Sequence, residues 1–317
     1  MGKHNSLRNP HQYQFSRPAY LLAMNRTKWI GLFSGLGAAA IWGGMYVVSK
    51  VVLDVIPPFS LVTLRLLLGI LVLWVIILRQ GGTGFTPRQT RQAVLVGLIG
   101  YGVSLGFQFI GTRLSTASNG ALVTSATPAF VLLFAAWLLH ERIRRRQLTA
   151  LLIATIGVLA VIDPRTATLS PDLFWGNLSL VAAALTWALY SVLVRKVTRE
   201  LRLLPATMVF FWGGLLVSLP AAVWEVNRSP WGQVNLGVIL GVLYLGVIST
   251  ALAMYLWNKA FATLPAGVAS LTFFAQPVVG AGLGALLLKE NLSLLFILGG
   301  VLIGAGLWLA AQGETVG

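Results

Sequence analysis

The chain has 317 residues, of which 57% are hydrophobic and only 10% are charged, and its mean hydropathy is +0.82. A soluble domain carries roughly 25% charged residues, so this composition excludes a charged, water-exposed surface and indicates a protein embedded in lipid. The absence of Cys excludes disulfides, thiol nucleophiles and Cys-ligated metals, and the net charge of +15, which in a soluble protein would suggest nucleic-acid binding, is explained by the positions of the basic residues.

The first 28 residues form a polar, basic segment whose only apolar patch is the short AYLLAM. We expect no signal peptide here, because a secretory signal needs a longer apolar region. Residues 1–28 are therefore predicted to be a cytoplasmic tail, to which no fold is assigned. Residues 1–23 could also be an upstream extension, because Met24 is a plausible start.

Ten apolar runs follow, each near the length of about 20 residues that a helix needs to cross a bilayer. We number them spans 1 to 10; they cover residues 29–49, 59–78, 93–112, 117–139, 147–162, 175–194, 204–224, 235–257, 266–288 and 294–311. The sequence therefore predicts an all-α polytopic membrane protein with ten transmembrane helices and the lipid bilayer as its surroundings.

The basic residues are distributed unevenly over the segments that connect these spans. If the N-terminus is cytoplasmic, 17 of the 23 Lys and Arg residues fall on the cytoplasmic side and 5 on the opposite side, with Arg65 inside span 2. Cytoplasmic loops carry an excess of Lys and Arg, so both termini are expected in the cytoplasm. We interpret the stretch ERIRRRQ at 141–147 as a cytoplasmic anchor rather than a lipid- or nucleotide-binding segment.

The two halves of the chain repeat each other at shifts of 149 and 145 residues. The aligned pairs are Pro128 and Pro277, Glu141 and Glu290, Ala117 and Ala266, Gly157 and Gly306 at the first shift, and Trp42 and Trp187, Lys50 and Arg195 at the second. Residues 29–163 and 175–312 then form two units of five spans, and because five is odd the units enter the membrane from opposite sides. Such inverted repeats build the gates of many secondary transporters; the alternative is chance similarity among helices rich in Leu, Ala and Gly.

Three long stretches resemble the EamA-like proteins of the drug/metabolite transporter superfamily. They read IWGGMYVVSKVVLDVIPPFSLVTLRLLLGIL from residue 41, FQFIGTRLSTASNGALVTSATPAFVLLFAAWLLHERI from residue 107, and ISTALAMYLWNKAFATLPAGVASLTFFAQPVVGAGLGALLLKE from residue 248. The resemblance covers roughly residues 29–311. It implies ten helices in two inverted repeats and export of amino acids or other small metabolites. A bacterial inner membrane is the usual setting of this family, with eukaryotic organelle membranes as the alternative.

Polar and aromatic residues at helical spacing form stripes on spans 1, 3, 4, 6, 8 and 9, and such a face avoids lipid. We therefore expect these six spans to surround a cavity, braced by the other four. The predicted substrate contacts are Trp42, Tyr46, Tyr101, Gln108, Asn119, Thr124, Trp187, Tyr190, Ser191, Tyr244, Tyr255, Asn258, Thr272 and Gln276. The alternative for each is a hydrogen bond that joins two helices.

Two prolines within apolar runs predict irregular helices. Pro128 and Pro277 each lack an N–H and push against the carbonyl four residues earlier, so both helices are expected to kink and to serve as gates. The competing interpretation is a static kink.

All eight acidic residues fall at or beyond the ends of spans, and the three His lie outside them. A proton relay through a buried carboxylate is therefore not expected. Glu290 is predicted to be a rim residue at the end of span 9. For Arg65 we expect the side chain to snorkel to the surface or to pair with Asp54, in preference to binding a substrate carboxylate.

These observations favour an alternating-access exporter of amino acids or similar small neutral or zwitterionic metabolites. The alternatives are an exporter of other organic solutes or drugs with the same fold, a membrane scaffold or a membrane enzyme, and the enzyme is disfavoured because no intramembrane nucleophile, base or metal set is visible. No cofactor, metal or nucleic-acid partner is expected. The sequence does not determine the oligomeric state, and a monomer is plausible.

Overall fold

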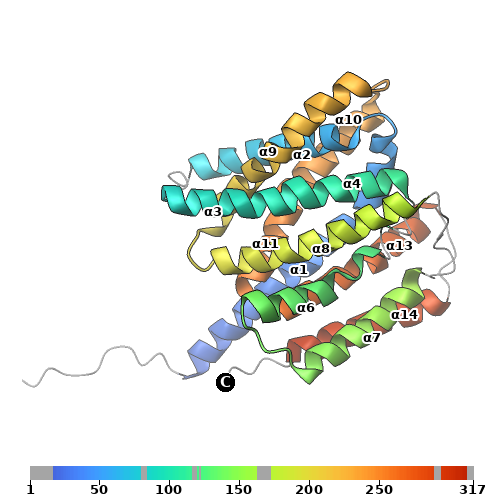
Figure 1. The fold of residues 1–317 in the computed structure, drawn as a ribbon. Coiled ribbons are helices and arrows are strands. Elements are labelled where there is room, and N and C mark those ends of the chain that lie inside the picture. Colours follow the sequence, from blue (N-terminus) through green and yellow to red (C-terminus); the bar gives the residue numbers. More distant parts are fainter. Residues whose placement is uncertain are drawn as a thin grey trace, which may run out of the picture.

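The computed structural model describes residues 17–79, 84–115, 120, 123–162, 173–288 and 294–312, and all regular structure in these ranges is helical. The helices, in chain order, are α1 (Arg17–Leu53), α2 (Pro58–Leu78), α3 (Pro87–Gly97), η1 (Leu98–Ser104), α4 (Leu105–Leu114), α6 (Thr127–Leu138), α7 (Arg145–Ile162), α8 (Phe174–Val197), α9 (Leu203–Arg228), α10 (Leu236–Leu243), η4 (Tyr244–Leu252), α11 (Ala253–Thr263), α12 (Ala266–Leu271), η5 (Thr272–Phe274), α13 (Ala275–Leu288) and α14 (Leu294–Gln312) (Figure 1). The predicted all-α architecture is confirmed for this part of the chain.

Five continuous helical stretches are long and apolar enough to cross a membrane. They are Pro58–Leu78, Pro87–Leu114, Phe174–Val197, Leu203–Arg228 and Leu236–Thr263. A sixth candidate is α1, which bends by 44° between Gly43 and Val47. Shorter apolar helices cover Thr127–Leu138, Ala266–Gly280 and Ile297–Gln312. The described chain is therefore a bundle of apolar helices suited to a bilayer.

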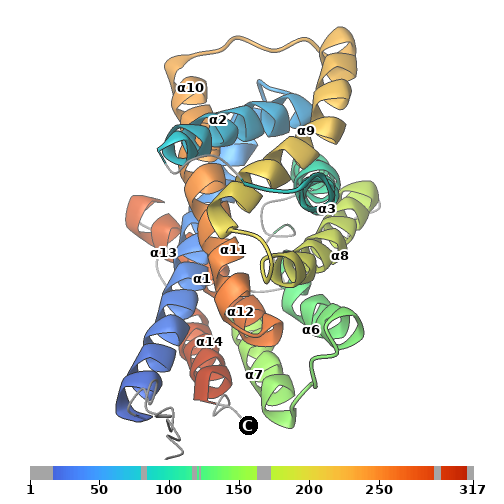
Figure 2. The same ribbon diagram turned by 90° about the vertical axis from the view of Figure 1, so that its left-hand side faces the viewer.

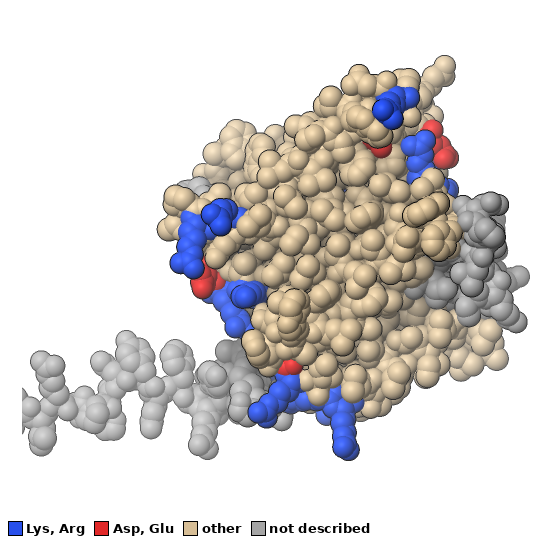
Figure 3. All heavy atoms as spheres, viewed as in Figure 1, with Lys and Arg blue, Asp and Glu red and all other residues tan. Residues whose placement is uncertain are grey.

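The surface of the bundle has a wide belt without charge. Figure 3 shows Lys and Arg gathered along the left and lower edges and at the upper right, with a broad uncharged face between them. Large apolar side chains are exposed on the surface of the bundle instead of being buried, such as Trp137 (69%), Leu133 (62%) and Val301 (65%). Lipid is the solvent that accommodates such a surface.

The start of α1 differs from the predicted tail. Residues 17–28, which were assigned to the tail without a fold, form the first turns of α1. The stretch PAYLLAM continues directly into the apolar face of span 1, and nothing between Arg17 and Trp29 interrupts a helix once Pro18 has been placed in its first turn.

Irregular helical segments occur at equivalent places in the two halves. A π-helical segment interrupts the third span of each half, η1 in the first and η4 in the second. A break at Ser125 and Ala126 precedes Pro128, and the 3₁₀ turn η5 precedes Pro277. π-Helical segments inside helices often mark functional sites; here one occurs in each half, and an irregular stretch precedes the proline of each half.

The predicted kink at Pro128 is corrected by this observation. Pro128 lies in the first turn of α6, where a missing N–H leaves no hydrogen bond unmade, so it begins a helix and does not bend a continuous one. Pro277 lies in the first turn of α13, directly after the 3₁₀ turn η5.

Small residues let the helices of the two halves approach closely. A Cβ atom on Gly43 of α1 would lie 2.9 Å from the backbone nitrogen of Gly280 of α13. A Cβ on Gly157 of α7 would lie 2.7 Å from the carbonyl oxygen of Gly299 of α14. Figure 2 shows α7 and α14 side by side at the lower end of the bundle, where α1 begins and the chain ends.

Candidate functional site

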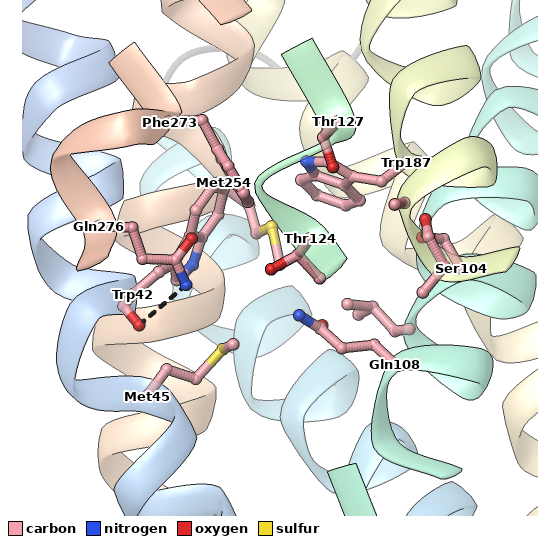
Figure 4. Close-up of a pocket in the computed structure, with 13 residues that line it drawn as sticks. Trp42, Met45, Ser104, Gln108, Thr124, Thr127, Trp187, Met254, Phe273 and Gln276 are labelled. Carbon is pink, nitrogen blue, oxygen red and sulfur yellow. Dashed lines mark hydrogen bonds between the residues drawn. The ribbon is translucent and has the colours of Figure 1, made fainter. Parts of the chain in front are cut away.

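A small pocket lies between helices from both halves of the chain. Its lining residues are Trp42, Met45, Ser104, Leu105, Gln108, Thr124, Thr127, Ala183, Ala184, Trp187, Met254, Phe273 and Gln276 (Figure 4). They come from α1, η1, α4, the segment before α6, α6, α8, α11, η5 and α13, which belong to spans 1, 3, 4, 6, 8 and 9. The volume open to the centre of a water molecule is about 30 Å³, so the pocket is nearly closed in this conformation.

Two tryptophans at equivalent positions of the repeat form one wall of the pocket. The rings of Trp42 and Trp187 meet edge to face, with centroids 5.7 Å apart and planes at 80°. Trp257 and Phe273 extend this aromatic cluster, at 5.4 Å and 6.2 Å from the Trp42 ring. Edge-to-face packing of this kind fixes ring orientation, so the wall is a preformed apolar surface.

The polar groups of the pocket differ in what they bind. Gln276 donates from Nε2 to the carbonyl oxygen of Trp42 at 3.2 Å, the dashed contact in Figure 4, and Trp42 Nε1 donates to the carbonyl oxygen of Ser249 at 3.0 Å. By contrast, the indole N–H of Trp187 and the hydroxyl of Thr127 are buried with no hydrogen-bond partner in the described structure. A buried donor without a partner is costly, so these two groups are the best-placed contacts for a bound solute.

Three predicted contact residues lie behind the pocket wall and bind one another. Tyr101, Tyr190 and Asn258 are fully buried. The hydroxyl groups of Tyr101 and Tyr190 share a hydrogen bond, Tyr190 donates to Asn258 Oδ1 at 2.6 Å, and Asn258 Nδ2 reaches Tyr101 at 3.3 Å and Thr207 Oγ1 at 3.1 Å. They were predicted to line the cavity, but they are not among the lining residues of this pocket: the network joins four helices and leaves their polar atoms satisfied.

Four further predicted contacts also lie away from the pocket. Ser191 accepts from Trp257 Nε1 at 3.0 Å, and Tyr244 donates to the carbonyl oxygen of Ile41 at 2.6 Å. Thr272 donates to the carbonyl oxygen of Ala269 at 2.6 Å.

Tyr255, the fourth, is half-buried, and the Lys259 ammonium lies 5.8 Å from its ring centroid. For these residues and for the Tyr101 network, the alternative of helix-to-helix or local bonding prevails.

The remaining predicted residues divide into two groups. Trp42, Gln108, Thr124, Trp187 and Gln276 line the pocket. Tyr46 lies in α1 at the bend, and its side chain is outside what the structure describes, as is all of Asn119.

Several lining residues were missed by the sequence prediction. Met45, Met254 and Phe273 are apolar residues in apolar helices, and no pattern separates them from residues that face lipid. Ser104 and Thr127 had a signal, because each belongs to a polar stripe. Within the described ranges no three His, Asp or Glu side chains come together as metal ligands would.

Arg65 is placed differently from either expectation. It neither snorkels nor pairs with Asp54, which is exposed at the end of α1; instead it is fully buried. Its Nε donates to the carbonyl oxygen of Leu245 at 3.2 Å and to Thr250 Oγ1 at 2.9 Å, both in η4. The side chain is fully buried, so it binds a carbonyl and a hydroxyl group of the π-helical segment instead of water.

One edge of the bundle is closed by a set of charged contacts, and we call it the basic edge, formed by residues 139–147, 195–202 and 261–266 with the start of α1 and the end of α14. Arg195 donates from Nε to Glu141 Oε1 at 2.6 Å and from Nη1 to the carbonyl oxygen of Phe261 at 3.2 Å and to that of Leu264. Glu141 Oε2 accepts from the backbone N–H of Ala266 at 3.1 Å. These contacts tie α6 and α8 to the turn between α11 and α12.

The opposite edge carries a related arrangement. Lys50, at the end of α1, donates from Nζ to the carbonyl oxygens of Thr112 and Ser115, each at 3.2 Å, and of Arg113 at 3.3 Å. Lys50 aligns with Arg195 in the internal repeat. Glu290, which aligns with Glu141 and was predicted to be a rim residue, lies outside the described residues.

The family model of the EamA-like transporter family matches residues 29–162 and 174–312. Among curated relatives, the probable amino-acid metabolite efflux pump of Salmonella typhimurium is 27% identical over 90% of this chain and 95% of its own length. The probable biotin transporter of Pseudomonas aeruginosa is 31% identical over 73% and 81%, and the uncharacterized transporter YetK of Bacillus subtilis is 26% identical over 86% and 84%.

A solved crystal structure shares the fold with a TM-score of 0.74 at 23% identity, covering 88% of this chain and 96% of the other. The resemblance seen in the sequence is thus confirmed, and the names of the relatives describe transporters and not enzymes. The chain therefore belongs to the EamA-like transporter family and is an integral membrane transporter.

Proposed function

We propose that this protein is an alternating-access exporter of amino acids or similar small zwitterionic metabolites. The observation that carries the proposal is the pocket whose aromatic wall contains Trp42 and Trp187. Its walls are aromatic and apolar, which suits an apolar side chain, and the unpartnered groups of Trp187 and Thr127 offer hydrogen bonds to a polar end. Ligand pockets commonly combine apolar walls with a few such polar groups.

The proposal includes ten membrane crossings in two inverted repeats, with both termini in the cytoplasm. Support comes from the internal repeat of η1 and η4 and from the positions of the basic residues. Lys and Arg gather at the edge where α1 begins and α14 ends, where Arg146 donates to the carbonyl oxygen of Leu309 at 2.7 Å. The excess of positive charge supports a cytoplasmic location of this edge, and a bacterial inner membrane is the membrane we propose.

Alternating access is supported by the equivalent contacts at the two edges. Arg195 and Lys50 each hold carbonyl groups at the end of the third span of one half, on opposite sides of the pocket. In transporters built from inverted repeats, the same elements form the inner and the outer gate. A pocket of about 30 Å³ must expand to hold any metabolite, which fits a conformation with both sides closed.

Counterflow into proteoliposomes tests the proposal. Vesicles containing the purified full chain are loaded with one unlabelled amino acid at a time, and uptake of the labelled form is followed against empty vesicles. We expect accumulation for at least one amino acid with a large apolar side chain. No accumulation for any amino acid, with the protein folded and inserted, would contradict the proposed substrate class.

A second candidate is an exporter of another organic solute on the same fold. The observation that favours it is the 31% identity to the probable biotin transporter of Pseudomonas aeruginosa. Biotin in the same counterflow panel separates the two: uptake of biotin without uptake of any amino acid would replace the first proposal by the second.

A further inference from the structure

Arg65 is a buried charge that the pocket description leaves without a role. Of the charged side chains in the described ranges, it alone is buried, with none of its surface exposed. No carboxylate among the described residues lies within ion-pair distance of it. An isolated ion away from water is strongly unfavourable, so an anion from outside the protein would stabilise this arrangement.

The guanidinium group has hydrogen-bonding capacity left. Arg carries five N–H donors. Nε is satisfied by Leu245 and Thr250, whereas Nη2 reaches only Ser249 Oγ at 3.4 Å, and Nη1 reaches only the thioether of Met45, with Sδ at 3.9 Å. A thioether is a weak acceptor, so the Nη1 side of the group lacks a strong partner.

That side of the guanidinium faces the wall of the pocket. Met45 lines the pocket, and its Sδ lies 3.9 Å from Arg65 Nη1, so this one side chain is in contact with both. The Arg65 guanidinium lies 5.0 Å from the centroid of the Phe109 ring. Phe109 directly follows the lining residue Gln108 in the chain. Ser249 joins the two sites directly, because its hydroxyl faces Arg65 and its carbonyl oxygen accepts from Trp42 Nε1 at 3.0 Å.

We propose that Arg65 is the anion-binding group of this pocket. A substrate carboxylate displaces the Met45 side chain, and its oxygens accept hydrogen bonds from the N–H groups of Nη1 and Nη2. The planar guanidinium matches a carboxylate with two parallel hydrogen bonds, and Met, unbranched with three rotatable bonds, moves aside more readily than other apolar residues. The inference rests on the proposed function and narrows its substrates to solutes that carry a carboxylate.

The test compares acids with their carboxamides. Binding of L-leucine, L-phenylalanine and L-methionine, each against its own carboxamide, is measured on the purified full chain by tryptophan fluorescence and by counterflow. For the wild type we expect a preference of about 10- to 100-fold for the acid, the usual range for a hydrogen bond to a charged group. In a folded Arg65→Met variant the preference disappears, whereas carboxamide binding changes little.

Two further variants keep the test decisive if Arg65→Met does not fold. Arg65→Lys retains the charge without the planar fork, so the preference for the acid falls. Met45→Ala uncovers the guanidinium, so the preference rises, whereas Met208→Ala, which changes a buried methionine outside the lining, leaves the preference unchanged.

The outcomes separate this inference from the proposed function. The inference would be overturned by a folded Arg65→Met variant with the wild-type preference, or by unchanged preferences in Arg65→Lys and Met45→Ala. Arg65 would then have only the structural role of binding η4 to α2. Equal binding of acid and carboxamide by the wild type would also overturn it while the transport proposal stands. Transport of neither ligand by the wild type would refute the proposed function itself.

Discussion

Lys50 and Arg195 occupy equivalent positions at opposite edges of the molecule and hold equivalent groups. Lys50 Nζ donates to the carbonyl oxygen of Ser115, and Arg195 Nη1 donates to that of Leu264, the residue 149 positions later in the chain. The internal repeat thus extends from sequence to individual hydrogen bonds. Each cation binds the first span of its half to the end of the third span of the same half. A gate at either edge would break this contact when it opens.

The ion pair between Glu141 and Arg195 is expected to keep the basic edge closed. The chain contains no Cys, so a single cysteine at the lining residue Ala184 reports access to the pocket. We expect Glu141→Gln to speed labelling of that cysteine from the basic edge about 5-fold, equivalent to ~1 kcal/mol for a partly exposed pair. The control Glu200→Gln changes an exposed acid at the same edge. Labelling that is unchanged or slower in Glu141→Gln would refute the closing role.

The free indole N–H of Trp187 is expected to contribute to binding and not to stability. Trp187→Phe keeps an aromatic ring and removes a donor that has no partner in the described structure. We expect the transported amino acid to bind about 3- to 10-fold more weakly, the range of one neutral hydrogen bond, at an unchanged midpoint of thermal unfolding. Trp137→Phe, at a residue 69% exposed on the lipid face, is the matched control. Full affinity in Trp187→Phe would exclude this contact.

Asn258, in contrast to Trp187, is expected to contribute to stability and not to ligand binding. Asn258→Leu removes the acceptor of the Tyr190 hydroxyl and a donor to Thr207, which keep only their bonds to Tyr101 and to the carbonyl oxygen of Leu203. The free energy of unfolding should fall by about 1–3 kcal/mol, while folded protein keeps its ligand affinity. Asn227→Leu, at an exposed end of α9, serves as the comparison. If Asn258→Leu abolished binding in a stable protein, the original prediction of a substrate contact would be restored.

The close approach of α1 and α13 predicts a sharp difference between two glycines. Gly43→Ala places a Cβ 2.9 Å from the backbone nitrogen of Gly280 and 3.0 Å from the carbonyl oxygen of Gln276. Backbone atoms cannot move aside cheaply, so we expect a loss of about 1–3 kcal/mol in stability. Gly304→Ala, with nothing within 4 Å of the added atom, should be neutral or stabilising. Equal unfolding midpoints for both variants would contradict this contact.

The sequence predicted which segments line the pocket better than which residues do. Polar stripes identify a helix face that avoids lipid, and the lining residues come from the six spans that carry such stripes. A stripe does not reveal what its face meets, and for this reason Tyr101, Tyr190 and Asn258 were misplaced: they avoid lipid by bonding to one another. Met45 and Phe273 had no signal, because apolar residues are the background of a membrane helix.

Arg65 shows a second limit of sequence reasoning. A lone Arg near the end of a span normally reaches the surface. Here the Arg65 side chain of α2 stays inside the bundle, because the carbonyl oxygen of Leu245 and the hydroxyl of Thr250, both in η4, accept hydrogen bonds from its Nε. The sequence contains no pattern from which these contacts could be predicted, and the geometry of the neighbouring helix decides where the charge lies.

Substrate protection of the cysteine at Ala184 tests the central claim most directly, namely that solute passes through the pocket lined by Trp42 and Trp187. Labelling of that cysteine is measured in proteoliposomes over a range of concentrations of the amino acid that gives counterflow. Half-protection is expected at the concentration that half-saturates counterflow, as one site serving both would require. Saturable counterflow with no protection at any concentration would show that the solute takes another route.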